Sequence, residues 1–332
     1  DRSAMIPLLF TGGTISMRLD AVRGGAVPSL SGKEILAATR GIEDVAEVEA
    51  EEWGRFPGPH MTIARMWALR NRVAEHLERS EVEGIVLTHG TDTLEESAYL
   101  MARSLRADKP IVFTGAMRNA SDLGWDGPAN LLDAVRVAAS PVSRGYGVLV
   151  VMSGRVYAGI DVTKAHTHLL DAFESPGLGP VGVIDDGAVI FRRALPEPQP
   201  LLEPASLVTP VDIVNAYAGA DGRLLDAVRL ESRGVVLSAL GRGNIPPEMV
   251  PAVEHWIAEG KPLVVTSRAG RGRVGITYGY PGGGRRLHDS GAILAGSRRP
   301  QQARIDLMLA LGAGMPVSGI REMFESYRAS ES

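Results

Sequence analysis

The sequence predicts an α/β protein of two domains, each built around a parallel sheet. Short apolar runs alternate with helix-length amphipathic segments, which is the pattern of βαβ units. The chain has 332 residues, a length that favours two domains over one. Residues 191–210 carry five prolines and little apolar periodicity, which is typical of an extended linker. We therefore expect domains at 1–190 and 211–332, joined by this proline-rich segment.

The individual elements follow from apolar runs and from helical periodicity. Before the linker, buried strands are predicted at residues 6–10, 84–88, 110–114 and 147–152. Helices are predicted at 61–80, 94–105 and 128–139; the first has apolar residues on one face (Ile63, Met66, Trp67, Val73, Ala74 and Leu77), and the third opens with Pro128. After the linker, strands are predicted at 211–214, 235–240 and 263–266, and helices at 247–259, 301–311 and 317–327.

Composition limits the possible partners. The chain is 45% hydrophobic and 22% charged, with a net charge of −4, so nothing indicates a basic surface for nucleic acid or an anionic membrane. No uninterrupted apolar run reaches about 18 residues, the length that spans a bilayer. The absence of cysteine excludes disulfides, thiolate metal sites and a cysteine nucleophile. We expect a cytoplasmic protein that acts on a small molecule.

Polar segments follow the predicted strands of the first region, at the edge where open parallel sheets bind ligands. These are residues 11–15 (Thr-Gly-Gly-Thr-Ile), 89–93 (His-Gly-Thr-Asp-Thr), 115–117 (Gly-Ala-Met) and 155–168. The paired glycines before Thr14 allow a sharp turn with accessible N–H groups. Such a segment is compatible with a plain tight turn and also with a loop that presents a nucleophile.

Nucleophilic chemistry at Thr14 requires a partner, because a threonine hydroxyl is a weak nucleophile until a base removes its proton. Thr91, Asp92 and Lys164 can supply that partner. A lysine that has lost its proton in a desolvated site can deprotonate a hydroxyl, while an aspartate orients it. The hypothesis from these residues is a hydrolase with Thr14 as the nucleophile.

The motifs resemble those of the bacterial L-asparaginase and glutaminase family. Residues 11–16 (TGGTIS) after an apolar strand, and residues 84–94 (GIVLTHGTDTL), are similar to the two signature segments of that family. Further similar segments occur in the same order at residues 114–118, 126–130, 161–164, 173–176 and 241–244. The resemblance covers nearly the whole chain.

The resemblance implies a large N-terminal, doubly wound α/β domain, a smaller C-terminal α/β domain, and dimers that pair into tetramers. It implies hydrolysis of the L-asparagine side-chain amide through an acyl-enzyme, in asparagine catabolism, with neither a cofactor nor a metal. Thr14 would attack the amide carbon, Thr91, Asp92 and Lys164 would manage the protons, and backbone N–H groups would hold the oxyanion. The expected substrate-binding residues are Gly13, Gly58, Pro59, His60, Gly90, Ala116, Asn244 and Tyr278, the last two serving a neighbouring subunit's site.

Three departures from the family pattern concern the substrate. Residues 17–30, expected as a mobile lid, contain no tyrosine. Gly58 or Pro59 stands where the family has a serine for the substrate carboxylate. Residues 271–286 contain no carboxylate and are more similar to the cytosolic branch of the family than to the periplasmic one. Alternative hypotheses are therefore the same chemistry on D-asparagine, glutamine, or a peptide-borne or N-substituted amide, and a sensor that binds an amino acid without turnover.

Other motifs are interpreted as structural. Residues 270–275 have the spacing of a dinucleotide loop, but more loop follows them where a fingerprint would open a helix. His166 and His168 could face one metal from a strand, but no third ligand is evident in the sequence. For His89 we expect a structural role, because Lys164 takes the part of the base.

Overall fold

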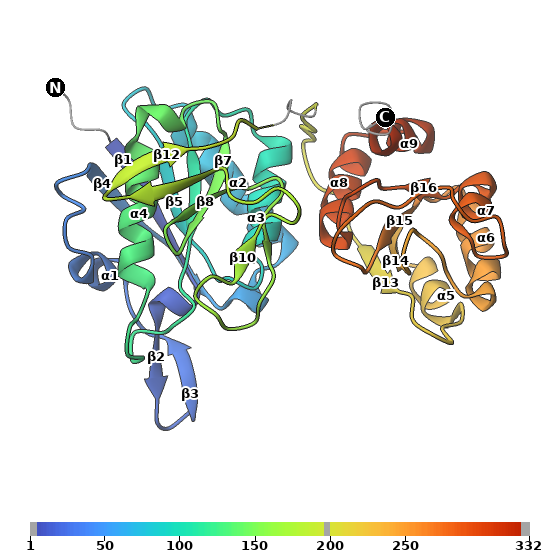
Figure 1. Cartoon of the computed structure of the whole chain (residues 1–332), viewed down its shortest axis with the longest axis horizontal. Coiled ribbons are helices and arrows are strands. Elements are labelled where there is room, and N and C mark those ends of the chain that lie inside the picture. Colours follow the sequence, from blue (N-terminus) through green and yellow to red (C-terminus); the bar gives the residue numbers. More distant parts are fainter. Residues whose placement is uncertain (1–4, 196–199, 327–332) are drawn as a thin grey trace. The chain divides into compact units, whose positions relative to one another are not determined.

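The computed structural model describes residues 5–195 and 200–326, and the chain divides into two compact units, Asp1–Leu201 and Leu202–Ser332. Figure 1 shows a sheet in each unit with helices packed against it. In the described part of the linker predicted at 191–210, Phe191 still belongs to a strand of the N-terminal sheet. Each unit is described by itself.

The N-terminal unit contains an eight-stranded sheet of order β12-β11-β8-β7-β6-β5-β1-β4. Its strands are β1 (Met5–Gly12), β4 (Glu47–Phe56), β5 (Ile85–Thr88), β6 (Ile111–Thr114), β7 (Val148–Met152), β8 (Arg155–Ala158), β11 (Gly182–Asp185) and β12 (Ala188–Phe191). Five neighbouring strands, β4, β1, β5, β6 and β7, run parallel to one another. The remaining three continue the sheet in antiparallel pairs, so the expected parallel sheet is in fact mixed.

Helices cover both faces of this sheet, which confirms the doubly wound arrangement (Figure 1). They are α1 (Gly32–Ala38), α2 (Ile63–Leu77), α3 (Leu94–Ser104) and α4 (Gly127–Ala139), with a short 3-10 helix η3 (Pro141–Ser143). Ile35 of α1 and Leu131 of α4 share one core with Leu8 of β1. On the opposite face, Leu69 of α2 and Leu94 of α3 pack with Leu9. Adjacent residues of β1 therefore point into two separate cores.

Helix α2 is shorter than the predicted segment of residues 61–80. It begins after Thr62, whose side chain accepts a hydrogen bond from the Arg65 N–H and caps the helix. Its buried positions include Met66 and Val73, as expected from the periodicity, but also His76. An imidazole on the buried face needs polar partners, and the neighbouring strand provides them.

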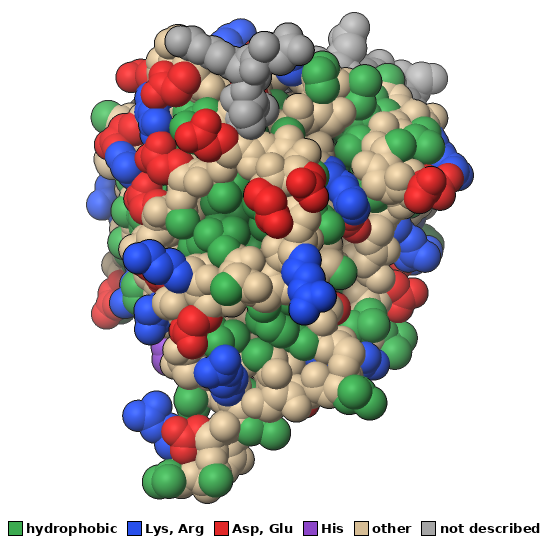
Figure 2. Space-filling view, turned by 90° about the vertical axis from the view of Figure 1, so that its left-hand side faces the viewer, with side chains coloured by type: hydrophobic (Ala, Val, Ile, Leu, Met, Phe, Trp, Pro, Cys, Tyr) green, Lys and Arg blue, Asp and Glu red, His purple; other side chains and the backbone are tan. Residues whose placement is uncertain are grey.

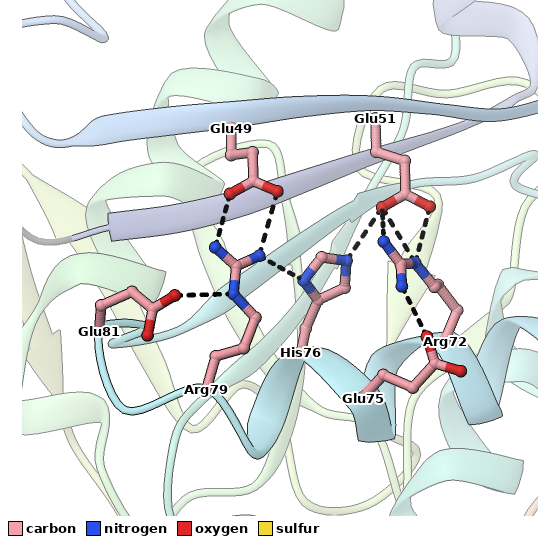
Figure 3. Close-up of polar contacts among 7 residues, drawn as sticks. All are labelled: Glu49, Glu51, Arg72, Glu75, His76, Arg79 and Glu81. Atoms are coloured by element: carbon pink, nitrogen blue, oxygen red, sulfur yellow. Dashed lines mark hydrogen bonds and ion pairs between the residues drawn. The ribbon is translucent and has the colours of Figure 1, made fainter.

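Edge strand β4 and helix α2 are joined by a network of charged side chains (Figure 3). The Glu51 carboxylate accepts hydrogen bonds from Arg72 and, at 3.0 Å, from His76 Nε2. Arg79 donates to Glu49 at 2.7 Å and lies 3.1 Å from His76 Nδ1. Because a guanidinium only donates, Nδ1 is the accepting nitrogen and Nε2 carries the proton. The network satisfies His76, which is 1% exposed.

The segment expected as a mobile lid, residues 17–30, forms a β-hairpin. Strands β2 (Met17–Asp20) and β3 (Gly25–Pro28) pair antiparallel, and the hairpin projects from the body of the unit (Figures 1 and 2). The Asp20 carboxylate accepts from the Val22 and Arg23 N–H groups, and Gly24 has φ +67°. These contacts close the turn, because aspartate and a left-handed glycine are the residues that tight hairpin turns use.

The C-terminal unit has a four-stranded parallel sheet of order β13-β14-β15-β16. Its elements are β13 (Val211–Asn215), α5 (Arg223–Arg229), β14 (Gly234–Ala239), η4 (Pro247–Met249), α6 (Val250–Ala258), β15 (Leu263–Ser267), α7 (Gly284–Ser290), β16 (Ile293–Leu294), α8 (Pro300–Gly312) and α9 (Val317–Glu325). Leu237, Trp256 and Val265 lie in its core. The smaller C-terminal α/β domain is thus confirmed. Residue 327, at the end of the last predicted helix, lies outside the described residues.

Candidate active site

The first part of the candidate site is the turn between β1 and the 3-10 helix η1 (Thr14–Ser16). Gly12 has φ +110° and Gly13 has φ +85°, backbone conformations that favour glycine. A Cβ on Gly12 would lie 2.4 Å from the Phe56 nitrogen, and the Gly13 N–H donates to the Phe56 carbonyl at 2.9 Å. The turn before Thr14 is therefore fixed against the end of β4 and has no room for side chains.

Three loops meet at Gly90, which follows strand β5. A Cβ on Gly13 would lie 2.6 Å from the Gly90 Cα, and a Cβ on Gly90 would lie 2.5 Å from the Gly58 Cα. Gly13 immediately precedes Thr14, and Gly90 immediately precedes Thr91. This close approach of backbones places the two threonine-bearing loops side by side, which would not be possible if these three glycines carried side chains.

Lys164 completes a three-residue group with Thr91 and Asp92. Its Nζ donates to Thr91 Oγ1 at 2.9 Å and to Asp92 Oδ1 at 2.6 Å. The Asp92 side chain is 56% exposed whereas that of Lys164 is 15% exposed, so the carboxylate retains access to a ligand and the amine is largely enclosed. The ammonium must release a proton before it can act as a base.

Lys164 reaches this position from a small ribbon. Strand β9 (Thr163–Lys164) pairs antiparallel with β10 (Phe173–Glu174), with Lys164 opposite Phe173. The polar segment of residues 155–168 therefore contains strand β8, a turn and strand β9.

The loop after β6 carries Ala116, one of the residues expected to bind the oxyanion or substrate. Asp126 accepts from the Met117 and Arg118 N–H groups, and Asn130 Nδ2 donates to the Gly115 carbonyl at 3.0 Å. A Cβ on Gly115 would lie 2.6 Å from the His89 carbonyl, so this loop borders the one that carries Thr91. In the sequence, Asn130 and Asp126 were identified only as part of a segment that resembles the family, and their role in anchoring this loop was not predicted.

Gly58, Pro59 and His60 form the 3-10 helix η2 (Gly58–His60) on the same side. The Thr93 hydroxyl donates to the Gly58 carbonyl at 2.8 Å, and a Cβ on Gly58 would lie 3.1 Å from Asp92 Cβ. Gly58 is thus held beside Asp92. His60 is exposed, and its carbonyl accepts from the Arg65 guanidinium.

Asn244 and Tyr278 belong to the C-terminal unit. Asn244 Oδ1 accepts from the Gly284 N–H at 3.1 Å, and Tyr278 is 43% exposed with its ring centroid 5.4 Å from that of Tyr280. Within one unit, the structure therefore brings together only the N-terminal members of the predicted site.

The histidines near the site have structural contacts. His89 is buried between the Gly90 carbonyl, 2.8 Å from Nδ1, and the Ser97 hydroxyl, 2.8 Å from Nε2. Burial lowers the pKa of His89 to about 4, which keeps the ring neutral at pH 7. His166 Nδ1 accepts from the backbone N–H groups of His168 and Leu169. Across residues 5–195 and 200–326, no three His, Cys, Asp or Glu side chains are grouped as metal ligands, and no helix there is long and apolar enough to cross a membrane.

The N-terminal unit has a mixed β-sheet covered by helices, and at the carboxyl edge of its parallel strands a threonine-bearing turn lies beside a Thr-Asp-Lys group. This arrangement is typical of α/β enzymes that act through a hydroxyl group. Family models identify which class this is. The model "Asparaginase, N-terminal" matches residues 5–197, and "Glutaminase/Asparaginase C-terminal domain" matches residues 210–324. The chain belongs to the asparaginase family of amidohydrolases.

Individual relatives are similar to this chain over nearly its whole length. A probable L-asparaginase of Deinococcus radiodurans is 39% identical over 96% of this chain and 96% of its own. An L-asparaginase of Bacillus licheniformis is 32% identical over 96% and 98% of the two chains. A solved structure described as a probable cytoplasmic L-asparaginase from Campylobacter jejuni matches with a TM-score of 0.86 at 28% identity, over 97% of this chain and 99% of that one.

Proposed function

We propose that this protein hydrolyses the side-chain amide of L-asparagine to aspartate and ammonia. The observation that carries the proposal is the pair of bonds from Lys164 Nζ to Thr91 Oγ1 and Asp92 Oδ1, located beside the Thr14 turn. The names of the relatives, L-asparaginase or probable L-asparaginase, favour this substrate.

The chemistry proceeds in two steps. The Thr14 oxygen attacks the amide carbon, and the hydroxyl proton passes through the Thr91, Asp92 and Lys164 group to the leaving nitrogen. Ammonia departs, and the acyl group remains as an ester on Thr14. Water then attacks the ester, and the proton that it loses returns to the Thr14 oxygen as aspartate is released. Backbone N–H groups beside Thr14, Thr91 and Ala116 stabilise the oxyanion in both steps. Gly13, Gly58, Pro59, His60 and Gly90 line the substrate, and Asp92 binds its α-amino group.

The assembly and location belong to the same proposal. The proline-rich segment that follows Phe191, the last residue of β12, links the domains. The C-terminal domain contributes to a dimer interface, from which Asn244 and Tyr278 serve the neighbouring subunit's site. The protein works in the cytoplasm as a homodimer or homotetramer. Light scattering of the purified chain measures the assembly: a monomeric mass together with full activity would contradict it.

The test of the activity is ammonia release from L-asparagine, D-asparagine and L-glutamine. We expect release from L-asparagine by the unaltered protein, and only background release by Thr14→Ala and Lys164→Met. The matched control is Lys109→Met, since Lys109 Nζ donates to the carbonyls of Leu77 and Arg79 in a structural contact. If the folded protein releases ammonia from none of the three substrates, the proposed substrate is wrong.

One sequence departure supports a second candidate, the same chemistry on another amide. Gly58 lacks the hydroxyl with which the family holds the substrate carboxylate, and the space at Gly58 is bounded by Asp92. A peptide-borne amide does not require that contact, because its α-carboxyl group is part of a peptide bond; an N-substituted amide is the other form of this candidate. Faster ammonia or amine release from such a substrate than from L-asparagine would favour it over the first proposal.

A further inference from the structure

Glu95 is a buried carboxylate next to the proposed catalytic group. It is the second residue of α3, the helix that begins directly after the Thr91–Thr93 segment, and it is 8% exposed. Its Oε2 accepts two hydrogen bonds from β9, one from the Thr163 hydroxyl at 2.7 Å and one from the Lys164 backbone N–H at 2.6 Å.

The ribbon that Glu95 holds has little stability of its own. Strands β9 and β10 have two residues each, and an isolated two-stranded ribbon is marginal in water even when it is longer. Lys164 also needs a fixed backbone, because its flexible four-carbon side chain must place Nζ between two acceptors. A single carboxylate oxygen that binds both residues of β9 supplies that constraint.

Glu95 also connects the two halves of the catalytic group through one helix. Asp92 lies three residues before Glu95 in the sequence, while Lys164 lies 69 residues after it. Asp92 therefore directly precedes the N-cap residue of α3, Thr93, while the Glu95 carboxylate in the first turn of the same helix holds the Lys164 backbone.

We infer that Glu95 is a positioning residue for amide hydrolysis, which sets Lys164 Nζ between Thr91 and Asp92 by holding β9. This inference rests on the proposed function of Thr91, Asp92 and Lys164. Glu95 acts through Lys164 and takes no part in binding the substrate.

The test compares Glu95→Ala and Glu95→Gln with Glu96→Gln, which makes the same change of charge on the next residue of α3. We expect Glu95→Ala to lower kcat by about 10²-fold with little change in KM, since misplacement of a catalytic group by about 1 Å has that effect. Glu95→Gln retains an acceptor oxygen and should lose less, about 10-fold.

Thr163→Val adds an internal check, because it removes one of the two donors to Glu95. We expect it to lower kcat on its own but to have no further effect in the Glu95→Ala background. Fully additive losses would overturn the inference, as would wild-type kcat in both Glu95 variants while Lys164→Met is inactive. If both Glu95 variants keep wild-type kcat while Lys164→Met is inactive, the proposed function stands and only the positioning role is wrong.

A measurement without turnover separates the two proposals. Labelling of the Lys164 amine by an acylating reagent, followed by mass spectrometry, should be faster in Glu95→Ala than in the unaltered protein because Nζ is no longer held between two acceptors. Equal labelling rates in the two folded proteins would overturn the positioning role. Faster labelling in a protein that releases no ammonia would support that role and reject the proposed substrate.

Discussion

Gly13 and Gly90 lie backbone against backbone, so close that a Cβ on Gly13 would be 2.6 Å from the Gly90 Cα. Each glycine immediately precedes a threonine of the proposed catalytic group, Thr14 and Thr91. The distance between these two hydroxyl-bearing loops is therefore determined by the absence of two side chains. The glycines of the TGGT and HGT segments are required for packing as well as for turning.

The first prediction concerns Gly90→Ala. The new methyl group would lie about 2.5 Å from the Gly58 Cα, so the loops must separate. We expect kcat for ammonia release to fall by about 10²-fold because the catalytic groups are displaced. The control is Gly145→Ala, which strains a backbone with φ +80° but has no atom within 4 Å of the new Cβ. A lowered melting temperature with unchanged kcat is expected for Gly145→Ala; equal kcat values for the two variants would contradict this explanation.

A second prediction concerns Asn130→Ala. The Asn130 side chain is 3% exposed, donates to the Gly115 carbonyl and accepts from the Ser153 N–H at 3.0 Å. Its removal leaves buried polar groups without these partners, which costs about 1–3 kcal/mol for each. We expect a lower free energy of unfolding in urea and a lower kcat, since the loop that carries Ala116 loses its anchor. Unchanged stability would show that water replaces the amide.

Much of this arrangement could be predicted from the sequence, and the exceptions have physical reasons. The predicted strands at 84–88, 110–114 and 147–152 match β5, β6 and β7 to within one residue, because central parallel strands are continuous apolar runs. Strand β4 was missed since an edge strand can be charged, and its sequence, EVEAEEWGRF, resembles a polar segment.

The contacts of single side chains are harder to predict. Glu95 has the sequence signature of an ordinary first-turn acid, which the helix dipole favours. Nothing in its spacing indicates that its partner, the Lys164 N–H, is 69 residues away. The family motifs identify Thr91, Asp92 and Lys164 as a group, but the residues that hold such a group in place depend on tertiary contacts.

A third prediction concerns the charged network of Figure 3. Burial raises the pKa of Glu51, but hydrogen bonds from Arg72 and His76 outweigh it, and the net shift is downward. A carboxyl group with a lowered pKa stabilises the fold above its unfolded pKa, and this stabilisation is lost as the pH falls through the folded value. We expect Glu51→Gln to lower the free energy of unfolding at pH 7 by about 1–3 kcal/mol, with a smaller difference from the unaltered protein in acid.

The matched control for Glu51→Gln is Glu75→Gln. Glu75 also binds Arg72, at 2.6 Å, but its side chain is 64% exposed. An exposed ion pair contributes about 0–1 kcal/mol, so this variant should be nearly as stable as the unaltered protein. Equal losses in the two variants would mean that the bond between Glu51 and the buried His76 ring contributes nothing of its own.

The last prediction concerns His89 and acid stability. Burial lowers the pKa of His89 from 6.5 to about 4, although the Gly90 carbonyl opposes the shift. Between these two pH values the unfolded chain binds a proton that the folded protein does not, so the free energy of unfolding decreases as the pH falls from 6.5 toward 4. A shift of this size corresponds to roughly 3 kcal/mol for the one residue. Above pH 6.5 the ring is neutral in both the folded and the unfolded state, so His89 does not make the free energy of unfolding depend on pH there.

The variant that isolates this contribution is His89→Gln, whose amide can bond to the Gly90 carbonyl or to Ser97 and does not titrate. Urea unfolding followed by tryptophan fluorescence should show a steeper loss of stability from pH 6.5 to pH 4 in the unaltered protein than in His89→Gln. The comparison of slopes remains valid if the substitution lowers stability at every pH, because a constant loss does not change a slope. Parallel curves would mean that His89 is protonated inside the folded protein, next to Thr91, and the ring would then be a candidate proton donor instead of a neutral structural residue.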